Sequence, residues 1–333
     1  MTTASLRSPV LLGLSFLALV SLPFWAPDEY KIHLAKLIAA YWILIGGLNL
    51  AVGYTGLLSI GHVGLFAIGA YAFAILAGTH GVDPYVALVA SGAVGGLCGL
   101  LLGLPSLRLP GFYFAMATMA FGMIVGELSL VFDGLTGGGA GIAVPGFPAP
   151  FDKPAGVFWL VLSLAVIVTG MTWNVARLMW GRSLIALRDS EVAAAAVGIP
   201  FYRSKLAVYA FSGVTAGVGG AVFASLQSYI TPETFVFDLG MFFFICIIIG
   251  GRGSILGPLM GTIVLTALPE VAAPLAKLGQ FFYGIVLLLV VLLVPEGIGS
   301  VFHLLRKQPP KTKHVVKPEL ELLTVALRGG PAR

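Results

Sequence analysis

The sequence predicts an all-α membrane protein, a polytopic helical bundle of about ten transmembrane helices with the N- and C-termini in the cytoplasm. Two compositional observations lead to this fold class: 58% of the 333 residues are hydrophobic and 10% are charged, whereas a soluble domain carries roughly 25% charged residues. The third observation is that the apolar residues form runs of about 20, the length of a bilayer-crossing helix. Some of these helices can be broken or re-entrant without changing the fold class.

The elements follow one another as apolar runs bounded by glycine, proline or charge. The first run, 9–25, follows Arg7, and no Ala-x-Ala cleavage site precedes Pro27, so we interpret it as a retained helix rather than a signal peptide. The next runs lie at 33–53, 60–79, 84–104, 111–132, 156–179, 204–227, 237–250, 254–273 and 279–298. Together these runs predict ten spans, give or take one.

The domain organisation is simple. Residues 1–302 form one transmembrane domain, in which the stretch 180–205 is the longest polar insertion between two spans. A basic, proline-containing tail follows at 303–333. We expect both the insertion and the tail to lie in the cytoplasm, and nothing in the chain resembles a separate soluble domain.

Lysine and arginine set the direction of the spans, because they accumulate on the cytoplasmic side of membrane proteins. With the N-terminus inside, 15 of the 19 basic residues fall in cytoplasmic segments, and the other four, Lys31, Lys36, Lys153 and Lys277, fall outside. Removing one span would place either the basic tail or the basic central loop outside. This asymmetry also explains the net charge of +5 without nucleic-acid binding.

Several chemistries are excluded or unsupported. No lysine follows a glycine, so a Walker A sequence is absent and the chain does not bind ATP through a P-loop. Cys98 and Cys246 lie in apolar runs without a CxxC pair, which disfavours a disulfide framework and a zinc site. We therefore expect no catalytic residues, no metal site and no cofactor bound by this chain.

Two glycine-rich clusters interrupt apolar runs, at 53–62 and at 250–258. Non-helical backbone at membrane depth is tolerated only where protein or a water-filled cavity covers it, and such segments mark the pathway in transporters. Glycine-packed cytoplasmic turns are the alternative. On the pathway interpretation, the polar residues in and just before the first cluster lie beside the translocation pathway: Asn49, Tyr54, Thr55, Ser59 and His62.

Three more polar residues are pathway candidates on later spans: Thr118, Glu127 and Thr136. Glu127 is the notable ionisable residue inside a span, and a carboxylate near a helix centre usually faces the protein interior. It lies only six residues from Asp133 at the outer end, so snorkelling of the carboxylate to the interface is the alternative explanation.

The central loop contains a distinct pattern between Arg188 and Pro200. An acidic start, an alanine-rich run and a Gly-Ile-Pro end predict a short capped helix outside the bilayer. A cytoplasmic helix with a small-residue face can insert into a groove on a soluble partner. A plain connecting helix is the alternative.

This loop closely resembles the coupling loop of permeases in branched-chain amino acid ABC importers of the LivM type. The resemblance is carried by RSLIALRDSE at 182–191, by Gly198 and by YRSKL at 202–206. It extends over about residues 40–298 through ordered motifs: NLxxGYTG at 49–56 with SxGH at 59–62, LRL at 107–109 with Gly111 and YFA at 113–115, LTGG at 135–138, and GGxGS at 250–254 with Gly257 and Pro258.

The resemblance implies a subunit of the bacterial inner membrane that pairs with a second homologous permease of the LivH type. It also implies two ATPase subunits of the LivG and LivF type, which would bind ATP and Mg, and a periplasmic solute-binding protein. The loop is similar to the EAA-type segment that docks on the ATPase, although its glycine follows the glutamate one residue later than in the common pattern. That similarity assigns ATPase coupling to Arg188, Asp189, Glu191, Ala193, Ala194 and Gly198.

The implied cargo is branched-chain or other hydrophobic amino acids. Similar permeases also serve urea, short amides and aromatic acids, and two departures bear on this choice: Met123 replaces a frequent Glu, with Glu127 one turn later, and 139–141 read Gly-Ala-Gly. These cargoes stay open as alternatives. The alternative of another class is a self-sufficient channel or secondary transporter, which needs more intramembrane charge than this chain has.

Overall fold

The computed structural model describes residues 29–109, 111–272, 284 and 288 of the chain. Within them, seven segments are long and apolar enough to cross a membrane, and one shorter apolar helix follows. All eight apolar runs predicted between residues 33 and 273 coincide with helices. The predicted spans at 9–25 and 279–298 and the tail at 303–333 lie outside the described residues, so the number ten and the side of the termini stay predictions.

The seven crossing segments are built from ten elements. In chain order they are α2 (Glu29–Asn49) continued by η1 (Leu50–Tyr54), α3 (His62–Phe73) continued by η2 (Ala74–Thr79), α4 (Pro84–Ser106), α5 (Gly111–Val131), α7 (Pro154–Arg177), α10 (Phe201–Gln227), and η4 (Pro232–Phe235) followed by α11 (Phe237–Gly250).

The remaining elements connect or extend these segments. They are α6 (Asp133–Thr136), η3 (Gly138–Ala140), β1 (Ile142–Ala143), α8 (Met179–Asp189), α9 (Glu191–Ala196), β2 (Tyr229–Ile230) and α12 (Gly257–Ala272). The described part of the chain is therefore mostly helical, with one short antiparallel strand pair in which Ile142 lies opposite Ile230.

Local sequence signals explain where several helices begin. Asp83 caps α4, because its side chain accepts a hydrogen bond of 2.8 Å from the Tyr85 amide, and Pro84 occupies the first turn, where no amide donor is required. Pro154 likewise occupies the first turn of α7. These caps satisfy or avoid amide donors that would otherwise face the membrane interface without a partner.

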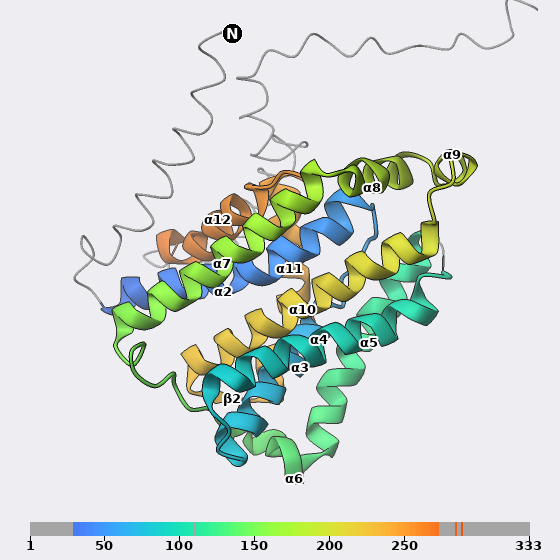
Figure 1. Ribbon diagram of the computed structural model, residues 1–333. Coiled ribbons are helices and arrows are strands. Elements are labelled where there is room, and N and C mark those ends of the chain that lie inside the picture. Colours follow the sequence, from blue (N-terminus) through green and yellow to red (C-terminus); the bar gives the residue numbers. More distant parts are fainter. Residues whose placement is uncertain (1–28, 110, 273–283, 285–287, 289–333) are drawn as a thin grey trace, which may run out of the picture.

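Helix α10 is the central element of the bundle. It packs against α2 on one side and against α3 and α4 on the other, while α7 covers α2, and α5 lies at the outer edge of the α3–α4 side (Figure 1). The second half of α2 is fully enclosed, with every residue from 39 to 54 buried. The core of the molecule therefore lies where α2, α3 and α10 meet.

Glycine brings α4 and α10 into direct backbone contact. A Cβ added to Gly95 would lie 2.8 Å from the Cα of Gly217, and one added to Gly99 would lie 3.1 Å from the Cα of Gly213. Real Cβ atoms essentially never approach as closely as at Gly95, and the contact at Gly99 would be tighter than most, so a side chain at either position requires the neighbouring helix to shift. Glycine recurs along α4 at positions 92, 95, 96, 99 and 103, and this glycine ladder faces α10. It allows the close helix packing expected for helices in lipid.

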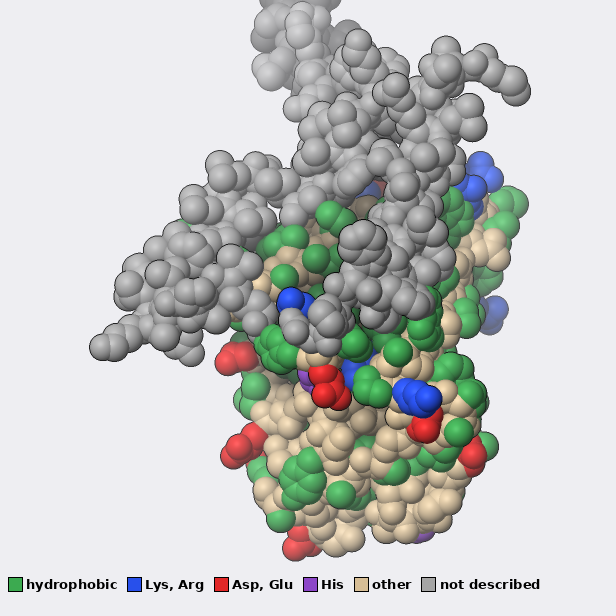
Figure 2. All heavy atoms as spheres, turned by 90° about the vertical axis from the view of Figure 1, so that its left-hand side faces the viewer, with side chains coloured by type: hydrophobic (Ala, Val, Ile, Leu, Met, Phe, Trp, Pro, Cys, Tyr) green, Lys and Arg blue, Asp and Glu red, His purple; other side chains and the backbone are tan. Residues whose placement is uncertain are grey.

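The outward-facing surface of the outer helices is apolar. Exposed side chains on α4 and α5 include Val89, Leu97, Phe112, Met116 and Ile124. On the side of the molecule shown in Figure 2, charged side chains occur as separate groups among apolar side chains and backbone. Such a surface suits contact with lipid tails or with another membrane subunit.

Candidate functional site

Three segments that are far apart in the sequence meet at one end of the bundle. They are the end of α2 with η1, the end of α8, and the turn between α11 and α12. We call this meeting point the glycine junction and define it by Asn49, Gly53, Gly56, Arg188, Gly253 and Ser254. It contains residues from both glycine-rich clusters and from the central loop, which the sequence alone could not place together.

The first glycine cluster begins with a widened helical turn. In η1 the amide of Thr55 bonds to the carbonyl of Leu50 at 3.2 Å, five residues back, and the Thr55 hydroxyl donates to the Ala51 carbonyl at 2.5 Å. Gly56 then adopts φ +73°, a left-handed conformation that is easy only for glycine. The helix ends here because this residue leads the chain out of the helical path.

The Asn49 side chain joins the two glycine clusters. Its amide nitrogen donates to the Ser254 carbonyl at 2.7 Å, and its oxygen accepts from the Gly253 amide at 3.0 Å. The backbones also touch, because a Cβ on Gly53 would lie 2.9 Å from the Cα of Gly253. Asn49 is buried, so these bonds satisfy a polar group that has no access to water.

Arg188 connects the end of α8 to this junction. One guanidinium nitrogen donates to the Gly53 carbonyl at 2.7 Å, and the Arg188 Cγ lies 2.9 Å from where a Cβ of Gly56 would stand. Its Nε lies 3.6 Å from the carboxylate of the neighbouring Asp189. Arg188 is therefore fixed between an adjacent exposed acid and the backbone of the first glycine cluster.

A buried polar cluster continues from the junction into α10. The Ser59 hydroxyl bonds to the Nδ1 of His62 at 2.7 Å and to the Tyr209 hydroxyl at 3.1 Å, and the Nε2 of His62 bonds to the Ser212 hydroxyl. All four side chains are fully buried. The start of α3 is thereby bonded to the middle of α10.

Thr118 holds the same segment from the side of α5. Its hydroxyl accepts from the Ile60 amide at 3.3 Å and lies 2.9 Å from the Ala115 carbonyl of its own helix. A Cβ on Gly61 would collide with the Thr118 backbone, so α5 and the start of α3 are in direct contact. Five of the pathway candidates therefore lie together, and each has a hydrogen-bond partner in the protein: Asn49, Thr55, Ser59, His62 and Thr118. The buried Tyr54 lies beside them in η1.

The other two candidates lie near the opposite end of the bundle. Thr136, at the end of α6, is buried, and its hydroxyl lies 2.6 Å and 2.8 Å from the carbonyls of Ser129 and Phe132. Glu127 is exposed on α5, four residues before the last residue of that helix, Val131. The structure therefore separates these two residues from the glycine junction.

The central loop contains two helices rather than one. The predicted short capped helix is α9, and its cap is Ser190, whose hydroxyl accepts from the Ala193 amide at 3.2 Å. Gly198 closes the segment with φ +81°. The sequence interpretation did not foresee α8, although Gly181, Leu184 and Leu187 recur every three residues and form its buried face.

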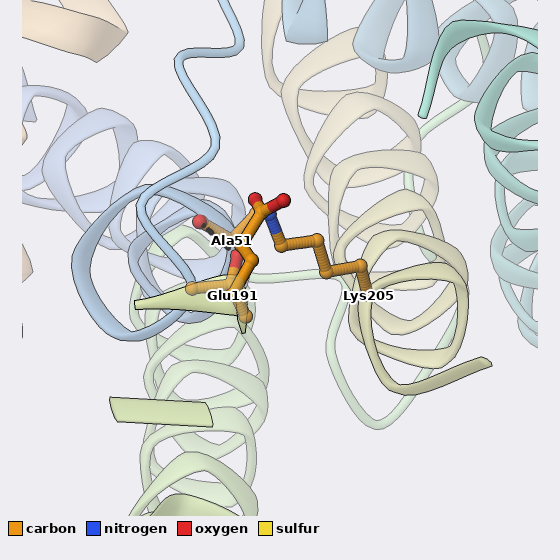
Figure 3. Close-up of polar contacts among 4 residues, drawn as sticks. Ala51, Glu191 and Lys205 are labelled. Atoms are coloured by element: carbon orange, nitrogen blue, oxygen red, sulfur yellow. Dashed lines mark hydrogen bonds and ion pairs between the residues drawn. The ribbon is translucent and has the colours of Figure 1, made fainter. Parts of the chain in front are cut away.

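An ion pair fastens α9 to α10. The Lys205 ammonium lies 2.5 Å from the Glu191 carboxylate (Figure 3). It also lies 4.6 Å from the centre of the Phe201 ring. The Lys205 side chain is only 6% exposed, whereas that of Glu191 is 55% exposed. Glu191, which the sequence analysis assigns to ATPase coupling, thus has a basic partner within its own chain, 14 residues later.

The other residues assigned to coupling lie on α9 or next to it. Ala194 is buried against the bundle, while Ala193 and Asp189 are exposed. Two apolar side chains of this region are also exposed: Val192 is 83% exposed and Val197 is 76% exposed. Across the described residues, no group of three or more His, Cys, Asp or Glu side chains is arranged to hold a metal ion.

Comparison with protein families gives one match over most of the chain. The family is described as "Branched-chain amino acid transport system / permease component", and it matches residues 32–291. This range contains all but the first three residues of α2 and every later element up to α12, and therefore the whole glycine junction.

Individual relatives carry the names of import permeases. The high-affinity branched-chain amino acid transport system permease protein LivM of Salmonella typhimurium is 30% identical over 306 residues, covering 84% of this chain and 72% of the relative, and the Escherichia coli K12 protein of that name is 31% identical with the same coverage. The autoinducer 2 import system permease protein LsrC of an Enterobacter species is 26% identical over 296 residues, or 85% of this chain and 81% of the relative. No solved structure matches.

Proposed function

Because the chain belongs to the family of permease components of branched-chain amino acid transport systems, we propose that it is the translocating subunit of a binding-protein-dependent ABC importer in the bacterial inner membrane. In this role it moves branched-chain or other hydrophobic amino acids into the cell. The energy comes from ATP hydrolysed by partner subunits. The family match over residues 32–291, together with seven membrane-crossing segments, is the observation that carries this proposal.

The arrangement of α8 and α9 supports a partner at one end of the bundle. Both helices lie outside the membrane-crossing segments, yet Arg188 and Glu191 fasten them to η1 and α10. The exposed Val192 and Val197 offer apolar contacts to a groove on another protein. An ATPase subunit bound there would push on helices that are already attached to the bundle.

In the assembly that we propose, this chain has four partner subunits besides membrane lipid. This chain pairs with a homologous permease of the LivH type, two ATPases of the LivG and LivF type bind α8 and α9 and hold ATP and Mg, and a periplasmic binding protein delivers the cargo. Residues 1–302 form the membrane domain, and 303–333 form a cytoplasmic tail.

The pathway candidates divide into two groups in this proposal. Asn49, Thr55, Ser59, His62 and Thr118 are bonded to other segments and position the backbone beside the pathway. The exposed Glu127 and the buried Thr136 lie near the other end, where cargo would enter. Tyr54, which ends η1, belongs with the first group.

Hydrophobic amino acids are the first candidate cargo, because two relatives are named for branched-chain amino acid transport. Relatives named for autoinducer 2 import provide the second candidate. Urea, short amides and aromatic acids complete the set to be tested.

The experiment is ligand-induced melting of the cognate binding protein. The panel contains leucine, isoleucine, valine, phenylalanine, urea, acetamide, benzoate and autoinducer 2. We expect leucine, isoleucine or valine to raise the melting temperature most and the loaded protein to stimulate ATP hydrolysis by the purified complex. Stabilisation by urea, acetamide or autoinducer 2 alone would contradict the proposed cargo. Failure of this chain to co-purify with the ATPases would contradict the proposed machine.

A further inference from the structure

We propose that Arg188 and Asn49 form a mechanical link that carries movement of α8 and α9 to both glycine clusters at once. The inference rests on the proposed function, in which ATPase subunits bind these two helices. The link is a route by which movement of the ATPase-bound helices reaches the membrane domain. Arg188 and Asn49 are then positioning residues of the transport cycle.

The first part of the link is the contact between Arg188 and Gly53. Arg188 lies in the last turn of α8, two residues before Ser190, the residue that caps α9. Its guanidinium reaches across to a backbone carbonyl at the end of η1, where helical carbonyls lose their regular partners. The arginine guanidinium is planar, always charged and pre-organised for such a bond, so little conformational entropy is lost in forming it.

The second part is the pair of bonds made by Asn49. The two ends of one amide group bind the amide of Gly253 and the carbonyl of Ser254, which are consecutive residues of the α11–α12 turn. Gly253 has φ +76°, and its backbone packs on that of Gly53. A shift of η1 must therefore move the turn between α11 and α12, or break both bonds.

A second attachment prevents α8 and α9 from sliding past the junction. The ion pair of Glu191 with Lys205 ties α9 to the start of α10. Further along α10, Tyr209 and Ser212 bond to Ser59 and His62, which lie at the end of the first glycine cluster. The segment 53–62 is thus held on one flank by Arg188 and on the other by α10.

This geometry predicts that breaking the link separates ATP hydrolysis from movement of the membrane domain. The test uses the full complex of this chain with its partner permease, both ATPases and the binding protein, with Cys98 and Cys246 replaced. A fluorescent label on Ile255→Cys reports on the α11–α12 turn, because Ile255 is partly exposed and directly follows Ser254.

The readouts are the shift in label fluorescence on trapping with ADP and vanadate, basal ATP hydrolysis, and its stimulation by the binding protein. We expect the label shift and the stimulation, each compared with the basal hydrolysis of the same complex, to fall about tenfold or more in Arg188→Ala, since both depend on the contact between α8 and the glycine clusters. Arg188→Lys keeps a donor for the Gly53 carbonyl and restores part of both signals. The matched control is Arg108→Ala, which removes an exposed arginine at the same end of the bundle.

A double-mutant cycle separates the link from direct contact of Arg188 with an ATPase. Asn49→Ala, or Asn49→Asp if the alanine variant does not assemble, acts on the other part of the link. If both residues serve one link, the double variant is no worse than the more severe single variant. The link would be overturned if the fold-loss of stimulation in the double variant equalled the product of the losses in the two single variants. It would also be overturned if the label shift persisted in Arg188→Ala. A wild-type chain that fails to assemble with ATPases would instead overturn the proposed function, so the two failures are distinguishable.

Discussion

The buried ammonium of Lys205 gives Glu191 a physical role inside this chain. Removing a charge from water is unfavourable unless an opposite charge and further contacts compensate for it. Glu191 and the ring of Phe201 supply that compensation. The pair therefore helps to hold α9 against α10, whatever else Glu191 contacts in an assembly.

We predict that Glu191→Lys places two ammonium groups together and detaches α9. Because Glu191 is half-exposed, the free energy with which this pair holds α9 against α10 should lie between two limits. It should exceed the ~1 kcal/mol typical of surface pairs and stay below the ~3–5 kcal/mol lost when a fully buried pair is broken. The measurement is binding-protein-stimulated ATP hydrolysis by the purified complex, with membrane insertion of the variant as control. Reversing the pair with Glu191→Lys and Lys205→Glu should recover part of the activity, and unchanged stimulation in the single variant would contradict the assignment.

One buried polar cluster was only half predictable from the sequence. It consists of Ser59, His62, Tyr209 and Ser212. Ser59 and His62 were recognisable as polar residues in an interrupted apolar run. Their partners on α10, 150 residues later, depend on which helices pack together, and a single sequence does not specify this. The same limit applies to Asn49 and its bonds to the second glycine cluster.

We predict that His62→Leu destabilises the protein, because the buried Ser212 hydroxyl loses its ring partner and the Ser59 hydroxyl keeps only its bond to Tyr209. Each buried hydroxyl that loses its partner costs about 1–3 kcal/mol. The measurement is the melting temperature of the detergent-solubilised complex. Ser163→Ala is the control, because that exposed hydroxyl bonds only within its own helix among the contacts described. Equal melting temperatures for the two variants would contradict the role of the cluster.

At the scale of elements, the contact between α4 and α10 depends on the absence of side chains. The glycine ladder of α4 was visible in the sequence, but the facing positions on α10 were not identifiable without the fold. Helix α8 was missed for a different reason: its 11 residues were interpreted as a polar loop, although their buried face repeats every three residues.

We predict that Gly95→Ala forces α4 away from α10. The new Cβ would stand 2.8 Å from the Cα of Gly217, and overpacking of this kind costs about 1–3 kcal/mol. The control is Gly126→Ala on α5, where nothing lies within 4 Å of the added Cβ and alanine favours the helix. The melting temperature should fall for Gly95→Ala and stay level or rise for Gly126→Ala. A fall of similar size in both would contradict the packing explanation.

At the scale of the whole molecule, hydropathy and charge predicted the helices well. Each predicted run between residues 33 and 273 became a helix, because a membrane helix satisfies its own backbone hydrogen bonds and needs only local sequence. The order of helices around α10 depends on side-chain fit between distant segments. That order, and the glycine junction it creates, therefore required the structure.

We predict that single cysteines at Ser190 and Pro148 are labelled from opposite sides of the membrane. Both residues are exposed and lie at opposite ends of the bundle, and the lysine and arginine excess places Ser190 in the cytoplasm. The assay uses an impermeant thiol reagent on intact and inverted vesicles, with Cys98 and Cys246 replaced. Labelling of Ser190→Cys and Pro148→Cys from the same side would refute the orientation.

The central claim, that this chain is the membrane subunit of an ATP-driven importer, is tested most directly by leucine accumulation in proteoliposomes containing the complete complex. ATP is enclosed with the cytoplasmic face, and binding protein and leucine are supplied outside. The account predicts accumulation above the external concentration that requires enclosed ATP, stops with vanadate and survives collapse of the proton and sodium gradients. Accumulation that needs no ATP and follows an ion gradient would contradict it, and would identify a secondary transporter instead.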